Sequence, residues 1–410
     1  MRAVVFRGVG DIRLESIAEP RIQKPNDAIV RLTASAICGT DLHMVRGTMP
    51  GMIPGTVLGH EGVGVVEETG SAVRNFRPGD RVVVPSTIGC GNCSYCRAGY
   101  YSQCDNANPN GPSAGTAFYG GPSSTGPFNG MQAEFVRVPF ANINLVKLPD
   151  EVTDDEAILL SDIFPTGYMA AELAEIHPGS TVAVFGCGPV GQFAIASAKL
   201  LSAGRIFAID AIPSRLEMAR SQGAEAINFE QEDPVQAIKG FTAGIGVDRV
   251  IDAVGVDANR PHSGPGARKA LLKAPRFGMD RMKGTMLKEK PADGNWHAGD
   301  APSQALEWAI EALAKAGTLS IIGAYSELTN TFPIGKAMEK NLTIKMGNCN
   351  HRKYIPALLE LVRNGTVKLA EVLTQVEPMS DVIQAYKLFD RRTPGWIKVM
   401  LEPQVERRAA

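Results

Sequence analysis

A glycine-rich turn between a buried strand and a helix is the feature that most restricts how this chain can fold. The segment Gly186-Cys187-Gly188-Pro189-Val190-Gly191 follows the apolar run 182–185 and precedes a helix expected over 192–200. In such a turn the first glycine makes the bend, the second lets a pyrophosphate approach the backbone, and the third permits close helix packing. The free amides at the helix start would then face the phosphates. The pattern predicts a dinucleotide-binding βα unit.

The alternation of strands and helices that begins near residue 156 extends well beyond this turn. Further apolar runs that are typical of buried strands lie at 205–209, 250–254, 319–322 and 342–344. Repeated βα units of this kind predict a doubly wound parallel sheet, and therefore an α/β fold.

The strand after the glycine turn ends in an acidic residue, Asp210, which lies 19 residues beyond Gly191. A carboxylate at this place accepts hydrogen bonds from the adenosine ribose hydroxyls and repels a 2′-phosphate, so we expect NAD rather than NADP. Arg215 lies close by in the sequence, where it either softens that exclusion or is only a solvated neighbour.

The first part of the chain has a different character. Residues 1 to about 150 are rich in Gly, Pro and short Val/Ile runs such as 28–32 and 81–84, which is typical of a β-rich domain with many loops. After about residue 349 a helical pattern returns, and 396–401 is strand-like. Because 410 residues exceed what one hydrophobic core usually supports, two domains are expected.

Four of the seven cysteines crowd into fifteen residues. They follow the pattern Cys-x2-Cys-x2-Cys-x7-Cys, at Cys90, Cys93, Cys96 and Cys104, with glycines beside them. Four thiolates close the shell of a tetrahedral ion and leave no position for a substrate, so the spacing predicts a structural Zn²⁺ site. An iron-sulfur centre and a set of unrelated free thiols are the alternatives.

Two shorter motifs also hold metal-ligand residue types, namely Cys38-Gly39-Thr40-Asp41-Leu42-His43 and Gly59-His60-Glu61-Gly62. Taken alone they are weak evidence, because a lone His is more often structural and a lone buried Cys packs as a small hydrophobe. Together with the four-cysteine segment and the glycine turn, they make the chain resemble the zinc-containing medium-chain alcohol dehydrogenases. The resemblance covers nearly the whole length apart from a segment at about 257–302.

The resemblance implies a domain organisation. A GroES-like, β-rich catalytic domain would comprise residues 1–155 and 349–410, and a Rossmann NAD-binding domain would comprise residues 156–348. The segment at about 257–302 would be an insertion in the second domain.

The resemblance also implies a catalytic zinc bound by Cys38 and His60, with Asp41 holding the imidazole of His60. The third ligand is a cysteine in the best-known members, but the matching position here is Asp162, which is similar to the formaldehyde-dehydrogenase-like branch. Carboxylate oxygen is an established zinc ligand. The alternatives for Asp162 are a helix N-cap and a solvated loop residue. Glu61 would enter the metal shell when water or substrate leaves.

Three protein ligands leave one coordination position for the oxygen of an alcohol. In the mechanism that the resemblance implies, Thr40 accepts the alcohol proton and passes it by way of the cofactor ribose towards His43 and solvent. His43 suits this step because an unperturbed imidazole has a pKa of about 6.5. The alternative for His43 is a surface residue without a role.

The segment at about 257–302 holds Pro, Gly and many Lys and Arg residues, and it matches no regular element well. It follows a strand that ends near residue 254, so it leaves from the cofactor-binding edge of the expected sheet. Long loops are either functional or disordered. We expect it to cover the adenine end of NAD and slow its release; the alternative is a surface excursion or an oligomer contact.

Composition excludes several other classes of protein. The formal net charge is −1 and 21% of the residues are charged, so no attraction to nucleic acid is expected. The N-terminus lacks the apolar run of a signal peptide, and no apolar stretch of about 18 residues indicates a membrane span. We therefore expect a cytoplasmic protein without nucleic-acid or membrane partners.

The leading hypothesis is an NAD-dependent zinc enzyme that oxidises small alcohols or aldehyde hydrates. A polyol, amino-alcohol or threonine dehydrogenase of the same family shares every motif and is the alternative. A non-catalytic NAD-binding relative is disfavoured because Cys38, Thr40 and His60 are all present, and a zinc-free quinone reductase because such relatives lack both metal sites. Family resemblance also predicts a homodimer or homotetramer, with 342–346 as a dimer edge.

Overall fold

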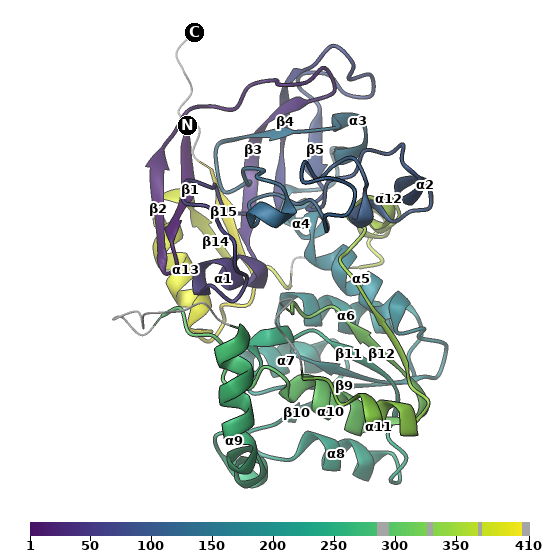
Figure 1. The fold of residues 1–410 in the computed structure, drawn as a ribbon. Coiled ribbons are helices and arrows are strands. Elements are labelled where there is room, and N and C mark those ends of the chain that lie inside the picture. The colour runs from purple at the N-terminus through teal and green to yellow at the C-terminus, as the bar shows by residue number, and fades with distance from the viewer. Residues whose placement is uncertain (285–294, 326–330, 368–370, 404–410) are drawn as a thin grey trace. The chain divides into compact units, whose positions relative to one another are not determined.

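The structure is a computed structural model that describes residues 1–284, 295–325, 331–367 and 371–403, and it divides into two compact units (Figure 1). Unit 1 comprises Met1–Pro165, Pro291–Trp296 and Asn348–Ala410. Unit 2 comprises Thr166–Lys290 and His297–Gly347. The predicted α/β fold class, a GroES-like sheet domain with a Rossmann-like parallel sheet, is confirmed.

Unit 1 is built on a seven-stranded sheet in the order β14-β15-β3-β4-β5-β7, with β6 paired to β3, and on a separate β1-β2 hairpin. Its strands are β1 (Arg2–Gly8), β2 (Asp11–Ser16), β3 (Ala28–Ile37), β4 (Gly62–Thr69), β5 (Arg81–Val84), β6 (Phe135–Val138), β7 (Val146–Lys147), β14 (Gln375–Pro378) and β15 (Val399–Glu402). Its helices are α1 (Gly39–Arg46), α2 (Ser94–Arg97), η1 (Tyr101–Gln103), η2 (Ser123–Thr125), α3 (Ala141–Asn144), α4 (Asp154–Ser161), α12 (His351–Arg363), η4 (Met379–Asp381) and α13 (Val382–Asp390).

The register of β3 brings distant parts of the sequence to one end of this sheet. Ser35 of β3 lies opposite Gly62 of β4, and Ile37 lies opposite Val399 of β15, both in antiparallel pairs. The residue after β3, the two residues before β4 and the residue before β15 therefore meet at the same edge. These residues are Cys38, His60, Glu61 and Lys398.

Unit 2 holds a six-stranded sheet in the order β10-β9-β8-β11-β12-β13, and all of its pairs are parallel. Its strands are β8 (Thr181–Phe185), β9 (Arg205–Asp210), β10 (Glu225–Asn228), β11 (Val247–Asp252), β12 (Leu313–Ile321) and β13 (Thr343–Met346). Its helices are α6 (Pro189–Leu200), α7 (Pro213–Ser221), α8 (Pro234–Phe241), η3 (Gly255–Asp257), α9 (Gly264–Gly284), α10 (Gln304–Ala312) and α11 (Ile334–Glu339); α5 (Ile163–Leu173) spans the boundary between the units.

Both faces of the parallel sheet are covered, as a doubly wound fold requires. Val182 and Val184 of β8 pack with apolar residues of α6 and α7 in one core cluster. Ala183 and Phe185, which point to the opposite face, pack with residues of α8 and α10 in another. Strand order reverses between β8 and β11, and the carboxyl ends of strands at such a point form the usual ligand crevice.

The segment at about 257–302 differs from the sequence-based expectation, because it contains the 21-residue helix α9. Ala270 and Phe277 form part of its buried side at helical spacing. Pro275 inside the helix and the glycines of this segment obscured that periodicity in the sequence. Residues 285–294 of the same segment lie outside the described residues.

Ion pairs fasten α9 to its neighbours in unit 2. Glu307 of α10 is buried and pairs with both Lys273 and Arg276 of α9. Lys269 pairs with Asp233, the N-cap of α8, at 3.0 Å. Just before α9, the backbone amides of residues 262 and 263 donate to Glu230, which follows β10. The helix is therefore held beside the carboxyl end of the sheet.

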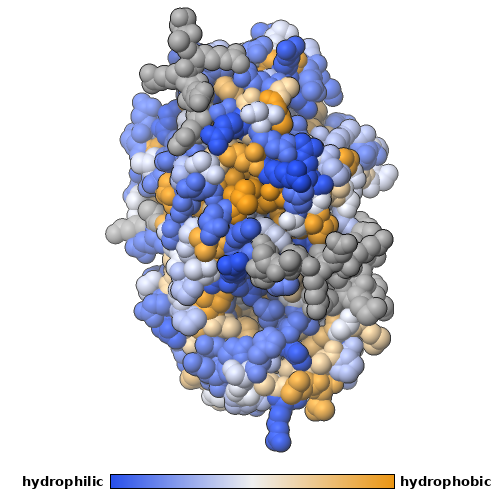
Figure 2. All heavy atoms as spheres, turned by 90° about the vertical axis from the view of Figure 1, so that its left-hand side faces the viewer, coloured by the Kyte–Doolittle hydropathy of each residue, from blue (hydrophilic) through white to orange (hydrophobic). Residues whose placement is uncertain are grey.

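Surface chemistry is mixed on the face drawn in Figure 2, where hydrophilic residues predominate and apolar residues gather in smaller patches. β13 is an edge strand of its sheet and exposes Met346, but the oligomeric state stays a prediction.

Within the ranges that the structure describes, none of the helices combines the length and the apolar character that a membrane span requires.

Candidate metal centres and cofactor site

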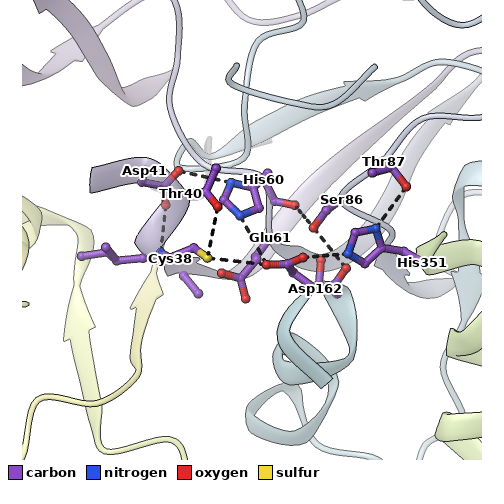
Figure 3. A network of polar contacts seen from close by, with 12 residues as sticks. Cys38, Thr40, Asp41, His60, Glu61, Ser86, Thr87, Asp162 and His351 are labelled. Carbon is purple, nitrogen blue, oxygen red and sulfur yellow. Dashed lines mark hydrogen bonds and ion pairs between the residues drawn. The ribbon is translucent and has the colours of Figure 1, made fainter. Parts of the chain in front are cut away.

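Four buried side chains from three separate segments converge in unit 1 (Figure 3). Cys38 is the N-cap of α1, His60 and Glu61 lie just before β4, and Asp162 lies between α4 and α5. One potential ligand atom from each lies within 4.8 Å of every other. The structure thus brings together the residues predicted for the catalytic metal, and Asp162, at 8% exposure, is not a solvated loop residue.

The spacing of these donor atoms fits a tetrahedral zinc ion. Asp162 Oδ2 lies 3.5 Å from Cys38 Sγ and 3.4 Å from His60 Nε2. Zinc with ligands at 2.0–2.3 Å places neighbouring donor atoms about 3.3–3.8 Å apart. One thiolate, one imidazole and one carboxylate also form a donor set that zinc accepts. The residues therefore fit the metal that the family implies.

Asp41 supports both the thiolate and the imidazole of this site. Its Oδ2 accepts the backbone amide of Cys38 at 2.9 Å, which completes a capping box at the start of α1. Its Oδ1 lies 3.2 Å from His60 Nδ1. A carboxylate at this nitrogen keeps the proton on Nδ1 and leaves Nε2 for a metal.

His351, at the start of α12, is a site residue that sequence analysis did not identify. Its Nε2 lies 2.7 Å from Asp162 Oδ1, and its Nδ1 lies 3.1 Å from Thr87 Oγ1. Burial lowers the pKa of His351, but Cys349 and the hydrogen bond to Asp162 outweigh it and raise the pKa to about 10. The imidazole therefore holds one oxygen of Asp162 while the other faces Cys38 and His60. The only available signal was that the chain has just six histidines.

Glu61 has a second partner that the sequence did not reveal. Lys398, just before β15, donates to Glu61 Oε1 and, at 3.2 Å, to the carbonyl of Ile37, and both charged side chains are fully buried. Among the residues that the structure describes, Glu61 Oε2 is buried and has no hydrogen-bond partner. A buried carboxylate oxygen left in this state beside the other donors is a further sign of a cation site.

The electrostatics of the site reflect competing buried charges. Burial and the neighbouring Asp162 raise the pKa of the Cys38 thiol. Burial alone would raise the pKa of Asp162 as well, but hydrogen bonds from His351 and His60 bring it well below its ordinary range. A divalent cation favours the ionised form of each of these acids, so metal binding releases protons from such a site.

Thr40 and His43 both lie on α1, one turn apart. Thr40 Oγ1 is 4.0 Å from Cys38 Sγ, so its hydroxyl lies at the edge of the metal centre. His43 is buried, with its Nδ1 2.9 Å from Thr48 Oγ1. The alternative interpretation of His43 as a surface residue is therefore wrong.

The four clustered cysteines form a second group of potential metal ligands, Cys90, Cys93, Cys96 and Cys104. The sulfurs of Cys93 and Cys104 are 3.9 Å apart, near the spacing of about 3.8 Å that four thiolates adopt around zinc. Backbone amides donate to three of the four sulfurs. Burial raises the pKa of Cys90, but the backbone amides of Asn92 and Cys93 and the side-chain amide of Asn106 outweigh it and lower the pKa to about 7. Such donors stabilise thiolates.

The glycine turn in unit 2 has the geometry of a phosphate cradle. Gly186 has φ of 87°, and a Cβ on Gly191 would lie 1.9 Å from the carbonyl oxygen of Gly186. A Cβ on Gly188, the N-cap of α6, would instead project into open space, with Arg215 nearest at 3.7 Å. Pro189 and Val190 open the helix. The turn thus leaves its backbone accessible where the sequence predicts the pyrophosphate.

Asp210 ends β9 beside this turn and is largely buried. Its carboxylate accepts backbone amides of Cys187, Ala211 and Ile212 at 2.7–3.0 Å. Arg215 Nη1 lies 3.8 Å from Asp210 Oδ2. The basic group that the sequence placed nearby is therefore a direct neighbour of this carboxylate.

Comparison with known proteins agrees with this fold. Residues 24–150 match the alcohol dehydrogenase GroES-like domain, and residues 189–263 match the zinc-binding dehydrogenase family. The chain belongs to the zinc-dependent medium-chain alcohol dehydrogenase family. It is accordingly an oxidoreductase of the zinc alcohol dehydrogenase type, and the family implies zinc, a nicotinamide cofactor and small-molecule alcohol substrates.

Several relatives match over almost their whole length. A zinc-type alcohol dehydrogenase-like protein of Bacillus subtilis is 37% identical, over 98% of this chain and 100% of the relative. A glutathione-independent formaldehyde dehydrogenase of Pseudomonas aeruginosa is 35% identical, over 100% of this chain and 99% of the relative. Among solved structures, an alcohol dehydrogenase from Thermus is 36% identical with a TM-score of 0.78, covering 98% of this chain and 100% of that one.

The buried pair of Lys398 and Glu61 predicts a large stability effect. We expect Lys398→Met to lower the free energy of unfolding by about 3–5 kcal/mol, because it leaves a carboxylate buried without its partner. The matched control is Lys147→Met, which breaks a pair with Asp80 whose lysine is 59% exposed, and should cost less than about 1 kcal/mol. Urea unfolding measures both. Equal effects of the two variants would contradict the importance of the buried pair.

Proposed function

We propose that the protein is an NAD-dependent dehydrogenase that oxidises small alcohols or aldehyde hydrates at a zinc ion held by Cys38, His60 and Asp162. An alcohol would lose a hydride to NAD⁺ and a proton to the protein, giving the carbonyl compound and NADH. A hydrated aldehyde would give the carboxylic acid by the same change. We further propose a second, structural zinc at the four clustered cysteines, which makes two zinc ions per chain.

The convergence of three donor atoms from distant segments carries this proposal. Asp162 Oδ2 lies within 3.5 Å of both the Cys38 sulfur and His60 Nε2, and all three residues are buried. Each of these groups loses its hydration in the protein core, and a shared metal ion would compensate for that loss. Three ligands leave a fourth position for the substrate, as catalytic zinc sites require.

Each polar residue of the site has a proposed part. Bound zinc supplies a Lewis acid that makes the alcohol proton easier to remove. Thr40, at the edge of the metal centre, accepts that proton through its hydroxyl, and His43 receives it later on the way to solvent. His351 holds Asp162 in place, and Lys398 holds Glu61, which we propose as an alternative ligand when the fourth position empties.

Asp162 in place of the usual third cysteine favours an activity like that of the formaldehyde-dehydrogenase-like branch. The similarity to a glutathione-independent formaldehyde dehydrogenase over the full chain supports the same assignment. A polyol, amino-alcohol or threonine dehydrogenase would use the same metal centre. A substrate screen distinguishes these two activities. The rate of NADH formation is measured by absorbance with formaldehyde, primary and secondary alcohols, polyols and threonine, each with and without glutathione. We expect formaldehyde oxidation that needs no glutathione.

The variant Cys38→Ser tests the metal assignment. It should lower the zinc content by one ion per chain and reduce turnover by at least about 10³-fold, because the hydroxyl is a poor zinc ligand at neutral pH. NAD binding, which depends on unit 2, should stay within about twofold of wild type. Full activity of Cys38→Ser with two zinc ions per chain would rule out the proposed site.

We propose that NAD is preferred over NADP because of the charge on Asp210. The variant Asp210→Asn keeps an oxygen for the neighbouring amides but removes the charge, and it frees Arg215 to meet a 2′-phosphate. The ratio of the Kd for NADP to the Kd for NAD should fall about tenfold or more in this variant. Arg215→Ala added to Asp210→Asn should reverse part of that change. An unchanged ratio in Asp210→Asn would refute this origin of the preference.

We propose that α9 slows the release of NAD by covering its adenine end. The contacts of α9 with Asp233 and Glu307, and of the residues just before it with Glu230, keep α9 at the carboxyl side of the sheet, where the cofactor would bind. Glu307→Ala should loosen α9 and speed NAD dissociation several-fold, since local opening costs less free energy. The control variant is Glu311→Ala. Glu311 lies on α10, as Glu307 does, and its ion pair with Lys336 is more exposed. Stopped-flow displacement of NADH measures the dissociation rate in both variants. Equal rates in Glu307→Ala and Glu311→Ala would exclude a role of α9 in cofactor release.

A further inference from the structure

A chain of buried hydrogen bonds leads from Asp41, whose Oδ1 lies 3.2 Å from His60 Nδ1, to a tyrosine on α13. Beyond Asp41, the amide of Gln132 donates through Nε2 to Asp41 Oδ2 at 3.2 Å and to the carbonyl of Ala36 at 3.0 Å. The hydroxyl of Tyr386 donates to Gln132 Oε1 at 2.8 Å. Asp41, Gln132 and Tyr386 are all fully buried.

The partners of Gln132 define which way its amide points. Nε2 faces two acceptors, Asp41 and a backbone carbonyl, while Oε1 faces the donor hydroxyl of Tyr386. In the flipped orientation, oxygen would face the Asp41 carboxylate and the carbonyl. Burial and the charge of Asp41 raise the pKa of Tyr386 well above its ordinary value, so the hydroxyl keeps its proton. The hydroxyl of Tyr386 therefore fixes the side chain of Gln132 so that its Nε2 donates to Asp41.

The backbone around His60 is shaped to admit Gln132. Gly59 has φ of 90°, and a Cβ there would lie 2.5 Å from Gln132 Cγ and 2.8 Å from its backbone nitrogen. The backbone N–H of Gln132 donates to the backbone carbonyl of Leu58, and the backbone N–H of Met131 donates to that of Gly59. Gln132 is thus packed directly against the loop that carries the imidazole.

A tryptophan from the end of the 257–302 segment packs against the outer end of this chain. The rings of Trp296 and Tyr386 have centroids 6.4 Å apart, and Trp296 is buried. Its backbone amide donates to Asp390 Oδ2 at 2.6 Å, and Asp390 also pairs with the buried Arg46. Trp296 therefore packs beside the ring of this fully buried tyrosine.

We propose that Gln132 and Tyr386 are positioning residues for the catalytic metal, which hold the Asp41 carboxylate so that His60 keeps its Nδ1 proton and presents Nε2 to the ion. This inference rests on the proposed function, since it takes Cys38, His60 and Asp162 as the metal ligands. A carboxylate held by two donors cannot rotate away from the imidazole without breaking one of them. Outer partners of this kind typically change metal affinity by about 10–100-fold.

Two variants test the chain, with a matched control. Gln132→Met removes the amide but keeps its length, and Tyr386→Phe removes only the hydroxyl. The control is Tyr119→Phe, which removes another fully buried tyrosine hydroxyl of unit 1, one without a hydrogen-bond partner and outside the chain described here. Each protein is loaded with Co²⁺, and the Co²⁺ affinity of the catalytic site is measured by competition with a chelator. Absorbance from the cobalt–thiolate bond that is lost in Cys38→Ser identifies that site.

We expect Gln132→Met to weaken Co²⁺ binding at this site about tenfold or more. Tyr386→Phe should weaken it about fivefold, the size expected when one hydrogen bond is removed from a network. Tyr119→Phe should leave it unchanged, and so should the cobalt affinity of the four-cysteine site in every variant. Wild-type affinity in both Gln132→Met and Tyr386→Phe would overturn the inference, as would an equal loss in Tyr119→Phe.

The same measurement separates this inference from the proposed function. If the wild-type protein shows no cobalt absorbance that depends on Cys38, the metal site itself is wrong. If it shows that absorbance and the two variants match wild type, only the positioning role fails. Urea unfolding of the metal-free variants reports any general loss of stability, which a change confined to metal affinity would not produce.

Discussion

The carboxylate of Asp41 connects two parts of the metal centre that are otherwise separate in the sequence. One oxygen closes the first turn of α1 through the amide of Cys38, and the other faces the imidazole of His60. Because the carboxylate is fully buried and removed from water, these neighbours and Gln132 stabilise its charge. The start of a helix and the loop before a strand are therefore held at a fixed separation, and that separation suits a metal ion.

The charges around this centre form alternating layers. Cys38, Glu61 and Asp162 bring acidic groups to the same buried point, and His351 and Lys398 stand behind the two carboxylates. Each outer group bonds one oxygen of its carboxylate and leaves the other directed inward. A protein core rarely tolerates acids gathered in this way unless a cation shares them. His351 and Lys398 therefore hold the two inner carboxylates in an arrangement that suits a metal ion before any substrate binds.

Local patterns allowed much of this structure to be predicted. The glycine turn, the strands at 182–185 and 205–209 and the four-cysteine segment each depend on neighbours within a few residues, so their chemistry is visible in the sequence. His351, Lys398 and Gln132 were missed because the side-chain and backbone groups that they contact in the site lie 91 to 361 residues away, and only the folded chain brings them together. α9 was missed for another reason: Pro275 and nearby glycines contradict helical propensity, and contacts with Glu307 outweigh that preference.

The discontinuous course of unit 1 sets an order on the assembly of the metal centre. Along the sequence, unit 2 falls between two long stretches of unit 1, and Lys398 belongs to the later of these stretches. During synthesis the nucleotide-binding sheet can close on itself while unit 1 still lacks α12, α13 and β15. His351 and Lys398 emerge from the ribosome after unit 2, so Asp162 gains its partner only once α12 is made, and Glu61 gains its partner only once β15 pairs with β3. The candidate metal centre therefore gains its outer partners only after the stretch of unit 1 that follows unit 2 in the sequence has been made.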